Sequence, residues 1–470
     1  MKNIRDKKSK NKGKNFKRLD NNKSNIRGKL VTVDVVKTTI EGKGVVSYQG
    51  EELAVADLLE GETAVIAIDR QNGQLSAKVV ELKRKSDRRV VSPCSYYEAC
   101  GGCQLQHLSY KGQLDFKSDK AMEVLRGLVE VRGVLGMDDP WNYRNKNLAT
   151  FAMDKGNRLA SGFYQEFSHK IVEVEDCLIQ DAEANAIIKT VSEMAGKFGL
   201  KAFDEDRGHG FLRHVLIRRG YYSGEVLVTL VVASSVFKGQ GNFVRELVKR
   251  HSCIKSVVLN VNNKRGSVVL GREEKVIYGP GFIEDSLLGL SFRVSSSSFY
   301  QINTRQTEVL YTKARELAGL KGSERVIDAY CGTGTIGIIA AGQAKEVVGV
   351  ELNRMAIRDA VSNARRNRVG NVSFVNQDAG EFMVGLDARC ELFDVVFVDP
   401  PRSGCSLDFL RSLVKLGPER VVYISCSVES LARDLEFLKG FGYVGSDCFL
   451  VDLFPWTYHI EAVVLLEKVK

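Results

Sequence analysis

Three reactive side chains near the C-terminal end of the chain each stand beside an apolar run. Cys426 follows RVVYIS, Asp399 follows DVVFV, and Glu461 precedes AVVLL. A thiolate is a nucleophile, and a carboxylate can remove a proton or accept a hydrogen bond from a substrate. Each also has an ordinary interpretation: a buried inert cysteine, an aspartate that caps a helix, and a glutamate at an exposed strand start. Only their combination therefore indicates chemistry.

One reaction uses all three groups, namely methylation of uracil at C5. Cys426 would add to C6 of the base, which turns C5 into an enolate carbon able to attack a sulfonium methyl group. Glu461 would then remove the proton from C5 so that the thiol is eliminated. Asp399 would hold the polar edge of the uracil in place. A helix expected to begin near Val428 would lower the pKa of the thiol, and a base in an RNA stem would first have to flip out.

A glycine-rich turn upstream predicts a cofactor site. The run VIDAY leads into GTGTIG at residues 332–337, which has the pattern GxGxxG, and Glu351 lies nineteen residues after Gly332. Such a turn lets the backbone approach an adenosine cofactor, and the carboxylate can accept the ribose hydroxyls. The motif alone does not separate NAD from S-adenosylmethionine (SAM). The tetrapeptide at 399–402, Asp-Pro-Pro-Arg, favours SAM because dinucleotide-binding folds do not usually show it.

Four of the ten cysteines have spacings typical of a metal site. Cys94, Cys100 and Cys103 form C-x5-C-x2-C, and 73 residues separate Cys103 from Cys177. Because the chain looks cytosolic, disulfides are not expected. Four thiolates suit zinc or an iron–sulfur cluster, and one tight CxxC with two outlying cysteines fits [4Fe–4S] better. Zinc and unliganded thiols remain alternatives.

The elements that must position these residues follow a regular pattern from residue 296 onward. A helix is predicted over 304–318, and the strands VIDAY, EVVGVE, VSFVNQD, DVVFVDPP and RVVYISC alternate with helical segments. Strands and helices that alternate in this way form a doubly wound parallel sheet with ligands at its carboxyl edge. The pattern therefore predicts an α/β, Rossmann-like domain over 296–470.

Three further regions precede this domain. Residues 1–29 hold twelve Lys and Arg against two Asp, which predicts a disordered basic tail, either a tether for a polyanion or a solubilising extension. Short alternating strands with glycine turns over 30–87 predict a small β-barrel, which either contacts RNA or only caps the fold. Residues 88–295 form a mixed α/β region, with a helix near 113–129 and strands over 224–233 and 255–262.

Length and composition set the class of protein. A chain of 470 residues with 44% apolar content is expected to form two or three globular domains. No apolar run reaches the roughly 20 residues of a membrane span, and the N-terminus is too polar for a secretory signal. We expect a cytoplasmic, monomeric enzyme.

Taken together, the motifs resemble the class I RNA uracil-C5 methyltransferases. The matching features are the four cysteines, the segment SFYQIN at 298–303, the helix motif LARD at 431–434 and the closing His459-x-Glu461. The closest likeness is to the branch that carries an OB-like TRAM barrel and a [4Fe–4S] cluster and modifies uridines of 23S ribosomal RNA. The resemblance covers nearly all of the chain after the tail and implies SAM as the methyl donor.

The resemblance also implies individual roles. Gln301 would contact SAM and Phe299 would pack on the flipped base, although Phe299 by itself reads as a core residue. The residues implied to line the cofactor or substrate pocket are Tyr330, Thr335, Glu351, Asp378 and Asp399. The cluster ligands would be Cys94, Cys100, Cys103 and Cys177. One departure concerns the nucleophile loop, where the family's Ser-Cys-Asn-Pro reads Ser-Cys-Ser-Val at 425–428; Ser427 can still cap the following helix.

Three other functions compete with methylation of 23S rRNA. The same chemistry could act on the tRNA T-loop, although relatives with that substrate usually lack the barrel and the cluster. A non-catalytic RNA-binding or assembly factor that retains SAM would fit the altered nucleophile loop. An NAD-linked oxidoreductase with an electron-transfer cluster would fit GTGTIG and the four cysteines, but it leaves Cys426, Glu461 and the basic tail without a role. No step of the methylation needs an electron, so a structural role is expected for the cluster.

Overall fold

The computed structural model describes residues 28–71, 74–154, 156, 158–165, 170–266, 268–389 and 391–469. The basic tail predicted over 1–29 lies outside the described residues except for its last two, because Gly28 is part of a turn and Lys29 begins the first strand. The chain divides into two compact units. The first contains residues 28–39 and 43–86, and the second contains residues 40–42 and all that follows from Asp87.

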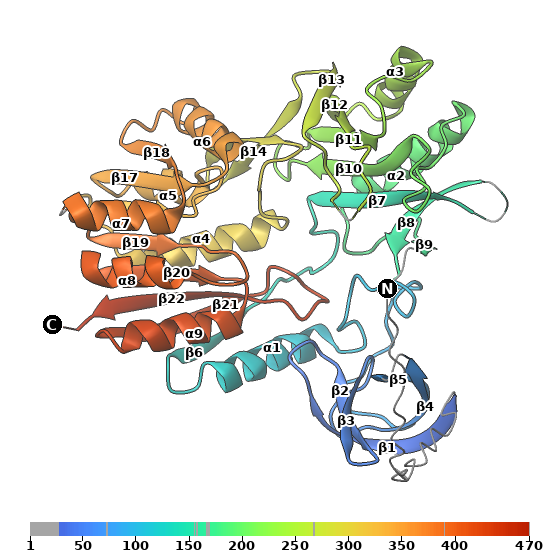
Figure 1. The fold of residues 1–470 in the computed structure, drawn as a ribbon, viewed down its shortest axis with the longest axis horizontal. Helices are drawn as coiled ribbons and strands as arrows, with labels where there is room; N and C mark the ends of the chain where they lie inside the picture. The colour runs from blue at the N-terminus through green and yellow to red at the C-terminus, as the bar shows by residue number, and fades with distance from the viewer. Residues whose placement is uncertain are drawn as a thin grey trace, which may run out of the picture. The chain divides into compact units, whose positions relative to one another are not determined.

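The first unit is, within the described residues, a five-stranded antiparallel sheet in the order β3-β2-β1-β4-β5 (Figure 1). Its strands are β1 (Lys29–Thr38), β2 (Gly44–Tyr48), β3 (Glu51–Val55), β4 (Thr63–Gln71) and β5 (Gln74–Arg84). Apolar side chains on one face form a core around Ile66 and Ile68. The edge strands β3 and β5 contact each other, so the sheet curls as in a small barrel. All five strands lie where the sequence predicted strands; the TRAM assignment stays a prediction.

A mixed sheet forms the first part of the second unit. Its order is β13-β12-β11-β10-β7-β8-β9, from β7 (Lys146–Met153), β8 (Leu159–Tyr164), β9 (Ile171–Glu173), β10 (Leu212–Arg219), β11 (Val226–Val232), β12 (Ile254–Val261) and β13 (Glu273–Tyr278). Helices α2 (Ala182–Lys197) and α3 (Gln240–Arg250) pack on one face. The two predicted strands are confirmed as β11 and β12. The predicted helix at 113–129 is α1 (Tyr110–Val124), which begins earlier because Ser109 caps it by accepting a hydrogen bond from Gly112 N.

The larger sheet carries the predicted cofactor edge. Its order is β18-β17-β16-β19-β20-β22-β21-β6, from β6 (Glu130–Leu135), β16 (Arg325–Ala329), β17 (Glu346–Glu351), β18 (Val372–Asn376), β19 (Val395–Val398), β20 (Arg420–Ser425), β21 (Tyr443–Val451) and β22 (Glu461–Lys468). The five predicted strands are parallel, but β22 runs antiparallel to β20 and β21. Strand β6 comes from the region predicted as a separate domain. The boundary at 295/296 therefore crosses one compact unit and stays a prediction.

Helices cover both faces of this sheet, as a doubly wound fold requires (Figure 1). One face packs against α4 (Thr304–Ala318), α5 (Thr335–Ala341), α6 (Arg354–Arg366) and the hairpin of β14 (Phe282–Leu287) with β15 (Leu290–Ser295). The other packs against α1, α7 (Ala379–Arg389), α8 (Leu407–Leu416) and α9 (Val428–Lys439). In the part of the chain that the structure describes, no helix is long and apolar enough to span a membrane.

Candidate active site

The predicted nucleophile and base meet because of strand register. In the antiparallel pair of β20 and β22, Ser425 lies opposite Ala462. One step further along this register brings Cys426, at the carboxyl end of β20, beside Glu461, at the start of β22. Asp399 follows the neighbouring strand β19, and its main-chain N–H donates to Ala329 O over 3.4 Å. The sheet thus places all three side chains at one edge, next to the predicted cofactor turn.

The electrostatics of this cluster are dominated by burial. Burial raises the pKa of Cys426 to about 11; Glu461 and Asp399 also raise it, and Arg402 opposes them. Burial raises the pKa of Asp399 to about 7 and, together with the charge of Asp399, raises the pKa of Glu461 well above its usual value. The position of Cys426 before α9 predicted a lowered thiol pKa, and this prediction is wrong. Desolvation and the two carboxyl groups raise the pKa by more than the helix terminus lowers it.

Arg402 and His459 belong to the same cluster, although sequence reasoning assigned no role to either. Arg402 Nη2 lies 3.3 Å from Nδ1 and 3.2 Å from Nε2 of His459. Burial, and then the charge of Arg402, lower the pKa of His459 to about 4, so the imidazole is neutral at pH 7. Arg402 is the exposed cation that balances Cys426 and Glu461. Its signal in the sequence was the last position of the Asp-Pro-Pro-Arg turn.

The glycine turn is fixed by hydrogen bonds that its main-chain N–H groups donate to two acidic side chains. Gly332 N donates to Glu351 Oε2 over 3.2 Å, and Asn353 N donates to Glu351 Oε1 over 2.7 Å. Gly337 N donates to Asp328 Oδ2 over 2.7 Å. Asp328 is fully buried, and burial raises its pKa to about 8. These bonds fix the loop and orient Glu351, which stays partly exposed at the tip of β17.

Gly334 offers a direct test of this turn. Its φ is +78°, and an added Cβ would lie 2.8 Å from the ring of Phe374. We expect Gly334→Ala to lose about 2 kcal/mol of stability, because alanine is strained at this φ and meets a packed ring. Affinity for S-adenosylhomocysteine should fall at least tenfold. Thermal unfolding and calorimetric titration would measure both. Gly370, where an added Cβ meets nothing within 4 Å, is the control position; equal effects at both positions would contradict this account.

The segment 298–303 lies against the glycine turn. Thr333 Oγ1 donates to Phe299 O over 3.3 Å, and the hydroxyl groups of Tyr311 and Thr335 lie 3.4 Å apart. Gln301 lines the same small cavity as Tyr311 and Thr335. Phe299 is 63% exposed, so the interpretation of Phe299 as a core residue is wrong. An exposed aromatic ring beside a cofactor turn is available to stack on a planar ligand.

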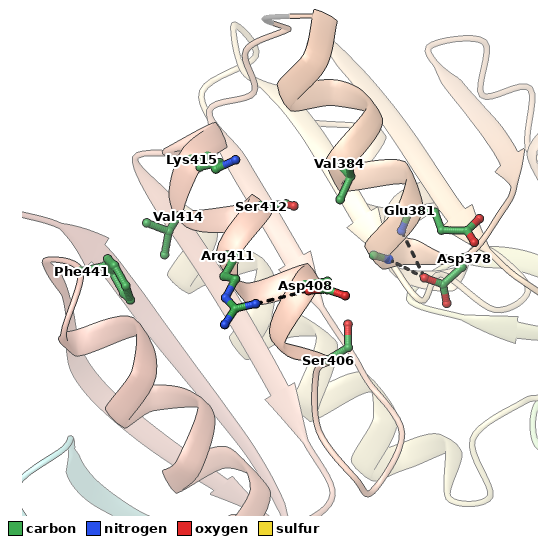
Figure 2. Close-up of a pocket in the computed structure, with 11 residues that line it drawn as sticks. Asp378, Glu381, Val384, Ser406, Asp408, Arg411, Ser412, Val414, Lys415 and Phe441 are labelled. Carbon is green, nitrogen blue, oxygen red and sulfur yellow. Dashed lines mark hydrogen bonds and ion pairs between the residues drawn. The ribbon is translucent and has the colours of Figure 1, made fainter.

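Asp378 lies at the N-terminus of α7, where its Oδ1 accepts from Gly380 N over 2.9 Å and from Glu381 N over 3.2 Å. Figure 2 shows it at one end of a cavity of about 570 Å³ between α7 and α8, with Ser406 and Asp408 on the other side. Tyr330, at φ +63°, packs on Phe409 of α8 with ring centroids 5.5 Å apart. The residues predicted to bind the cofactor therefore lie at the carboxyl ends of neighbouring strands, from Asp378 after β18 to Asp399 after β19.

The loops that carry Cys426 and Arg402 are fixed by α9. Ser427 Oγ accepts from Ser430 N over 3.3 Å, so the predicted cap of this helix is confirmed. Buried Asp434 accepts from Cys405 N over 2.8 Å and from the hydroxyl of Tyr423 over 2.6 Å. Helix α9 thereby restrains the turn after β19 and the end of β20 together.

The four spaced cysteines lie near one another in the second unit. Burial, and to a smaller extent the other three thiols, raise the pKa of Cys103 to about 12. Cys103 and Cys177 both pack against the cluster that contains Tyr143 and Trp456. All four thiols are free. Among the described residues, no three side chains of His, Cys, Asp or Glu are arranged closely enough to hold a metal ion.

The chain is similar in sequence to known and inferred RNA methyltransferases. The family model described as tRNA (uracil-5-)-methyltransferase matches residues 163–469. An uncharacterized RNA methyltransferase from Halalkalibacterium halodurans is 42% identical over 92% of this chain and 97% of its own length. Another from Caldanaerobacter subterraneus is 39% identical over 94% of this chain and 98% of its own.

A solved structure is similar over almost the full length of the chain. The Pyrococcus abyssi tRNA (uracil-54, C5)-methyltransferase, in complex with S-adenosyl-L-homocysteine, superimposes with a TM-score of 0.77 and 27% sequence identity. The match covers 93% of this chain and 100% of that one. The likeness thus extends beyond the cofactor-binding sheet to the regions that precede it.

Proposed function

This chain belongs to the tRNA (uracil-5-)-methyltransferase family and is an RNA methyltransferase, and from that premise we propose that it methylates C5 of a uridine through a covalent adduct on Cys426. The observation that carries the proposal is the register of β20 and β22, which sets Cys426 beside Glu461 at the edge that holds the glycine turn. A thiol and a carboxyl group at that place supply both the nucleophile and the base that the reaction needs.

The first steps activate C5. The partly exposed Cys426 thiol releases its proton to solvent water. Its sulfur then bonds to C6 of the uracil, which places the electron pair of the C5–C6 double bond on C5 and O4. C5 then attacks the methyl carbon of SAM, and the sulfonium leaves as neutral S-adenosylhomocysteine. The cation of Arg402 opposes the high pKa of the thiol and stabilises the thiolate. Asp399, next to this cluster, accepts or donates a hydrogen bond at the polar edge of the base.

The last step releases the product. C5 now carries both the methyl group and its original hydrogen, next to the C4 carbonyl. Glu461 takes this proton, the electron pair re-forms the C5–C6 double bond, and the sulfur of Cys426 leaves C6. A buried carboxylate is a stronger base than one in water, so the raised pKa of Glu461 suits this role. Phe299 stacks on the base while it is out of the RNA helix.

SAM fits the residues at the carboxyl edge of the sheet. The glycine turn and Glu351 suit the methionine and ribose parts of the cofactor, and Asp378 lies where the adenine would end. We assign Gln301, Tyr330 and Thr335 to the rest of the cofactor pocket; Gln301 and Thr335 line one small cavity. Support comes from the Pyrococcus abyssi enzyme, which binds the demethylated cofactor on the same fold.

Cations near the site support an RNA substrate. Lys146 on β7 lies opposite Arg218 on β10, and burial together with the charges of Arg218 and Arg144 lowers the pKa of Lys146 to about 8. The charge of Arg144 also lowers the pKa of His459. The guanidinium group of Arg218 donates a hydrogen bond to Ser298 O, directly before Phe299. No salt bridge among the described residues includes any of these three cations. Arg144 and Lys146 are partly exposed and suit the phosphates that flank a flipped nucleotide. Arg218 is buried, with Asp359 and Glu274 as acidic neighbours, and instead supports the segment before Phe299.

We keep 23S ribosomal RNA as the first candidate substrate and the tRNA T-loop as the second. The ribosomal assignment rests on the combination of the β1–β5 sheet, taken as a TRAM barrel over 30–87, with the cysteine region in 88–295. The Pyrococcus abyssi enzyme acts on tRNA and matches 93% of this chain, so domain content does not separate the two RNAs. We propose that the enzyme works as a monomer.

The decisive experiment combines the purified protein, methyl-labelled SAM and two undermethylated RNAs, 23S rRNA and tRNA. Digestion and mass spectrometry then locate the label. Label in 5-methyluridine of 23S rRNA supports the full proposal, and label in tRNA moves the substrate. If neither RNA is labelled, the proposal of catalysis is contradicted. The Ser427-Val428 departure in the nucleophile loop would then favour a non-catalytic RNA-binding factor.

The four cysteines fit a metal cluster by the chemistry of their donors. Cys94, Cys100, Cys103 and Cys177 would supply four soft thiolates in a half-buried, partly aromatic setting, and we propose that they hold a [4Fe–4S] cluster with a structural role. Protein purified without oxygen should contain about four iron and four sulfide per chain. Elemental analysis would measure this, with Cys177→Ser as the variant expected to lose iron. One zinc per chain and no iron would overturn the assignment.

A further inference from the structure

The segment from Asp452 to His459 leads directly into the strand that begins with Glu461, and residues from far upstream hold it. Asn303 Nδ2 donates to Leu453 O over 3.1 Å, and the hydroxyl of Tyr143 donates to Pro455 O over 3.0 Å. The segment is an irregular connection between β21 and β22. Its conformation is therefore set by these external contacts and not by a helix or a strand of its own.

Trp456 is the most restrained residue of this segment. Its main-chain N–H donates to Gln113 Oε1 over 2.9 Å, and its indole N–H donates to Pro140 O over 3.0 Å. Its carbonyl oxygen accepts from the main-chain N–H groups of Gln104 and Leu105, both over 3.0 Å. The side chain is 6% exposed. Every polar group of this residue is thus bonded to a part of the chain more than 300 residues away.

The backbone of Trp456 adopts a conformation that bulky residues avoid. Its φ is +70°, in the left-handed region. Such a conformation persists only where the surroundings over-determine it, and strained residues of this kind gather at functional sites. The indole ring stacks on Trp141 with centroids 4.1 Å apart and meets Tyr110 at 5.7 Å. The surroundings therefore hold the ring and the backbone of Trp456 together.

A buried ion pair anchors the beginning of the same segment. Lys117 Nζ lies 2.6 Å from Asp452 Oδ1, and both side chains are fully buried. The same ammonium group donates to Phe454 O over 3.2 Å, and the hydroxyl of Tyr110 donates to Asp452 Oδ2 over 2.8 Å. Removing one partner of such a pair leaves an uncompensated charge. Helix α1 thus anchors the start of the connection through Lys117 and Tyr110.

The restraint passes from Trp456 to the site through a short turn. Thr457 follows Trp456, and its Oγ1 donates to Phe454 O over 2.9 Å. The same oxygen accepts from His459 N over 3.3 Å. His459 contacts Arg402, and Glu461 begins β22 two residues later. A shift of the Trp456 backbone would therefore move the entry to β22 and the carboxyl group at its start.

We propose that Trp456 is a positioning residue that holds Glu461 at the distance from C5 needed for proton removal; this rests on the proposed function of Glu461 as the base. The loop that follows Cys103 supplies two of its hydrogen bonds, which ties the cysteine-bearing region to the last step of the reaction. Misplacing a catalytic group by about 1 Å can lower a rate by about a hundredfold. Trp456 itself touches no reacting atom.

The proposal predicts a defect in one step. In Trp456→Ala, adduct formation and methyl transfer should proceed, but proton removal should be slow. We expect turnover to fall about 10- to 100-fold with the KM for RNA changed less than threefold. A methyl-labelled complex of RNA with protein should accumulate and survive on a denaturing gel. Trp456→Phe, which retains a stacking ring, should recover at least a third of the wild-type rate.

Two matched variants separate positioning from general loss of stability. Phe243, fully buried in α3 against α2 and β10, lies in another core; Phe243→Ala should lower the melting temperature without accumulating the complex. Glu461→Gln should accumulate the complex. If Glu461→Gln does and Trp456→Ala does not, the proposal for Trp456 is overturned while the function stands. If neither does, the assignment of Glu461 as the base fails, and the role of Trp456 fails with it.

The two tryptophans of the chain give a readout independent of activity. Trp141 and Trp456 are its only indoles and they stack on each other, so tryptophan fluorescence reports this contact alone. If Trp456→Ala does not fold, Trp141→Ala can be used in its place, because it removes the ring on which Trp456 stacks. We expect that variant to shift the fluorescence of Trp456 and to accumulate the labelled complex. A shifted spectrum with wild-type turnover and no complex would overturn the proposal.

Discussion

Cys426→Ala is expected to abolish methylation, with a loss of at least about 10⁴-fold in single-turnover rate. Without the sulfur, C5 of uracil never gains the electron density to attack the methyl group. Alanine leaves the end of β20 and the cap by Ser427 intact, so the fold should be retained. Transfer of labelled methyl groups to RNA measures the rate. Titrations with S-adenosylhomocysteine and with RNA should give affinities within about threefold of wild type.

Cys253 provides the matched control for this variant. Its thiol is also half-buried, and burial likewise raises its pKa to about 11, but its partner is Glu183 at the start of α2. Cys253→Ala should methylate RNA at the wild-type rate. If Cys426→Ala retained more than a tenth of wild-type activity, the covalent mechanism would be wrong. The enzyme would then have to activate C5 by another route.

Glu461→Gln is expected to stop the reaction one step later. Turnover should fall by about 10²- to 10⁴-fold, the usual contribution of a general base, while methyl transfer from SAM still occurs once. The RNA therefore stays bonded to Cys426 and carries the new methyl group. A denaturing gel with labelled SAM would show a protein band shifted by the mass of the RNA. Free methylated RNA at the wild-type rate would contradict the assignment.

The burial of Glu461 makes this substitution conservative for the fold. Glu461 is only 3% exposed, and burial raises its pKa well above the usual value, so its environment disfavours the charged form. A glutamine amide has nearly the shape of the carboxyl group and no charge, so the melting temperature should change little. Glu467, near the exposed end of the same strand, is the control. Glu467→Gln should neither slow turnover nor trap RNA.

Local patterns were enough to predict most elements of the fold. Period-two alternation located β1 to β5, and apolar runs that alternate with helical segments located the parallel strands of the larger sheet. The helix predicted over 304–318 coincides with α4, which Asn303 caps by accepting from Gln306 N. These signals depend on residues within a few positions of one another. They could be read without knowing which strands are neighbours.

Long-range pairing could not be predicted in the same way. Strand β6 joins the larger sheet beside β21, more than 300 residues later in the chain, and β22 enters it in reverse. Neither event has a signature in the local sequence, because strand pairing depends on residues far apart in the chain. A strand such as β22, whose first residues are buried on both faces, also reads the same in either direction. For this reason the proposed domain boundary at 295/296 falls inside one compact unit.

The sequence by itself determined which residue types could do chemistry: a cysteine, an aspartate and a glycine turn after strands, and a glutamate at the start of one. Tertiary structure decided how they act. The register of β20 and β22 made Cys426 and Glu461 neighbours, and burial raised both pKa values against the expected effect of the helix terminus. Tertiary structure also brought Arg402 to the same cluster and fixed Trp456 in the segment that leads into β22. Proximity and desolvation depend on the whole packed chain, so no local pattern could reveal them.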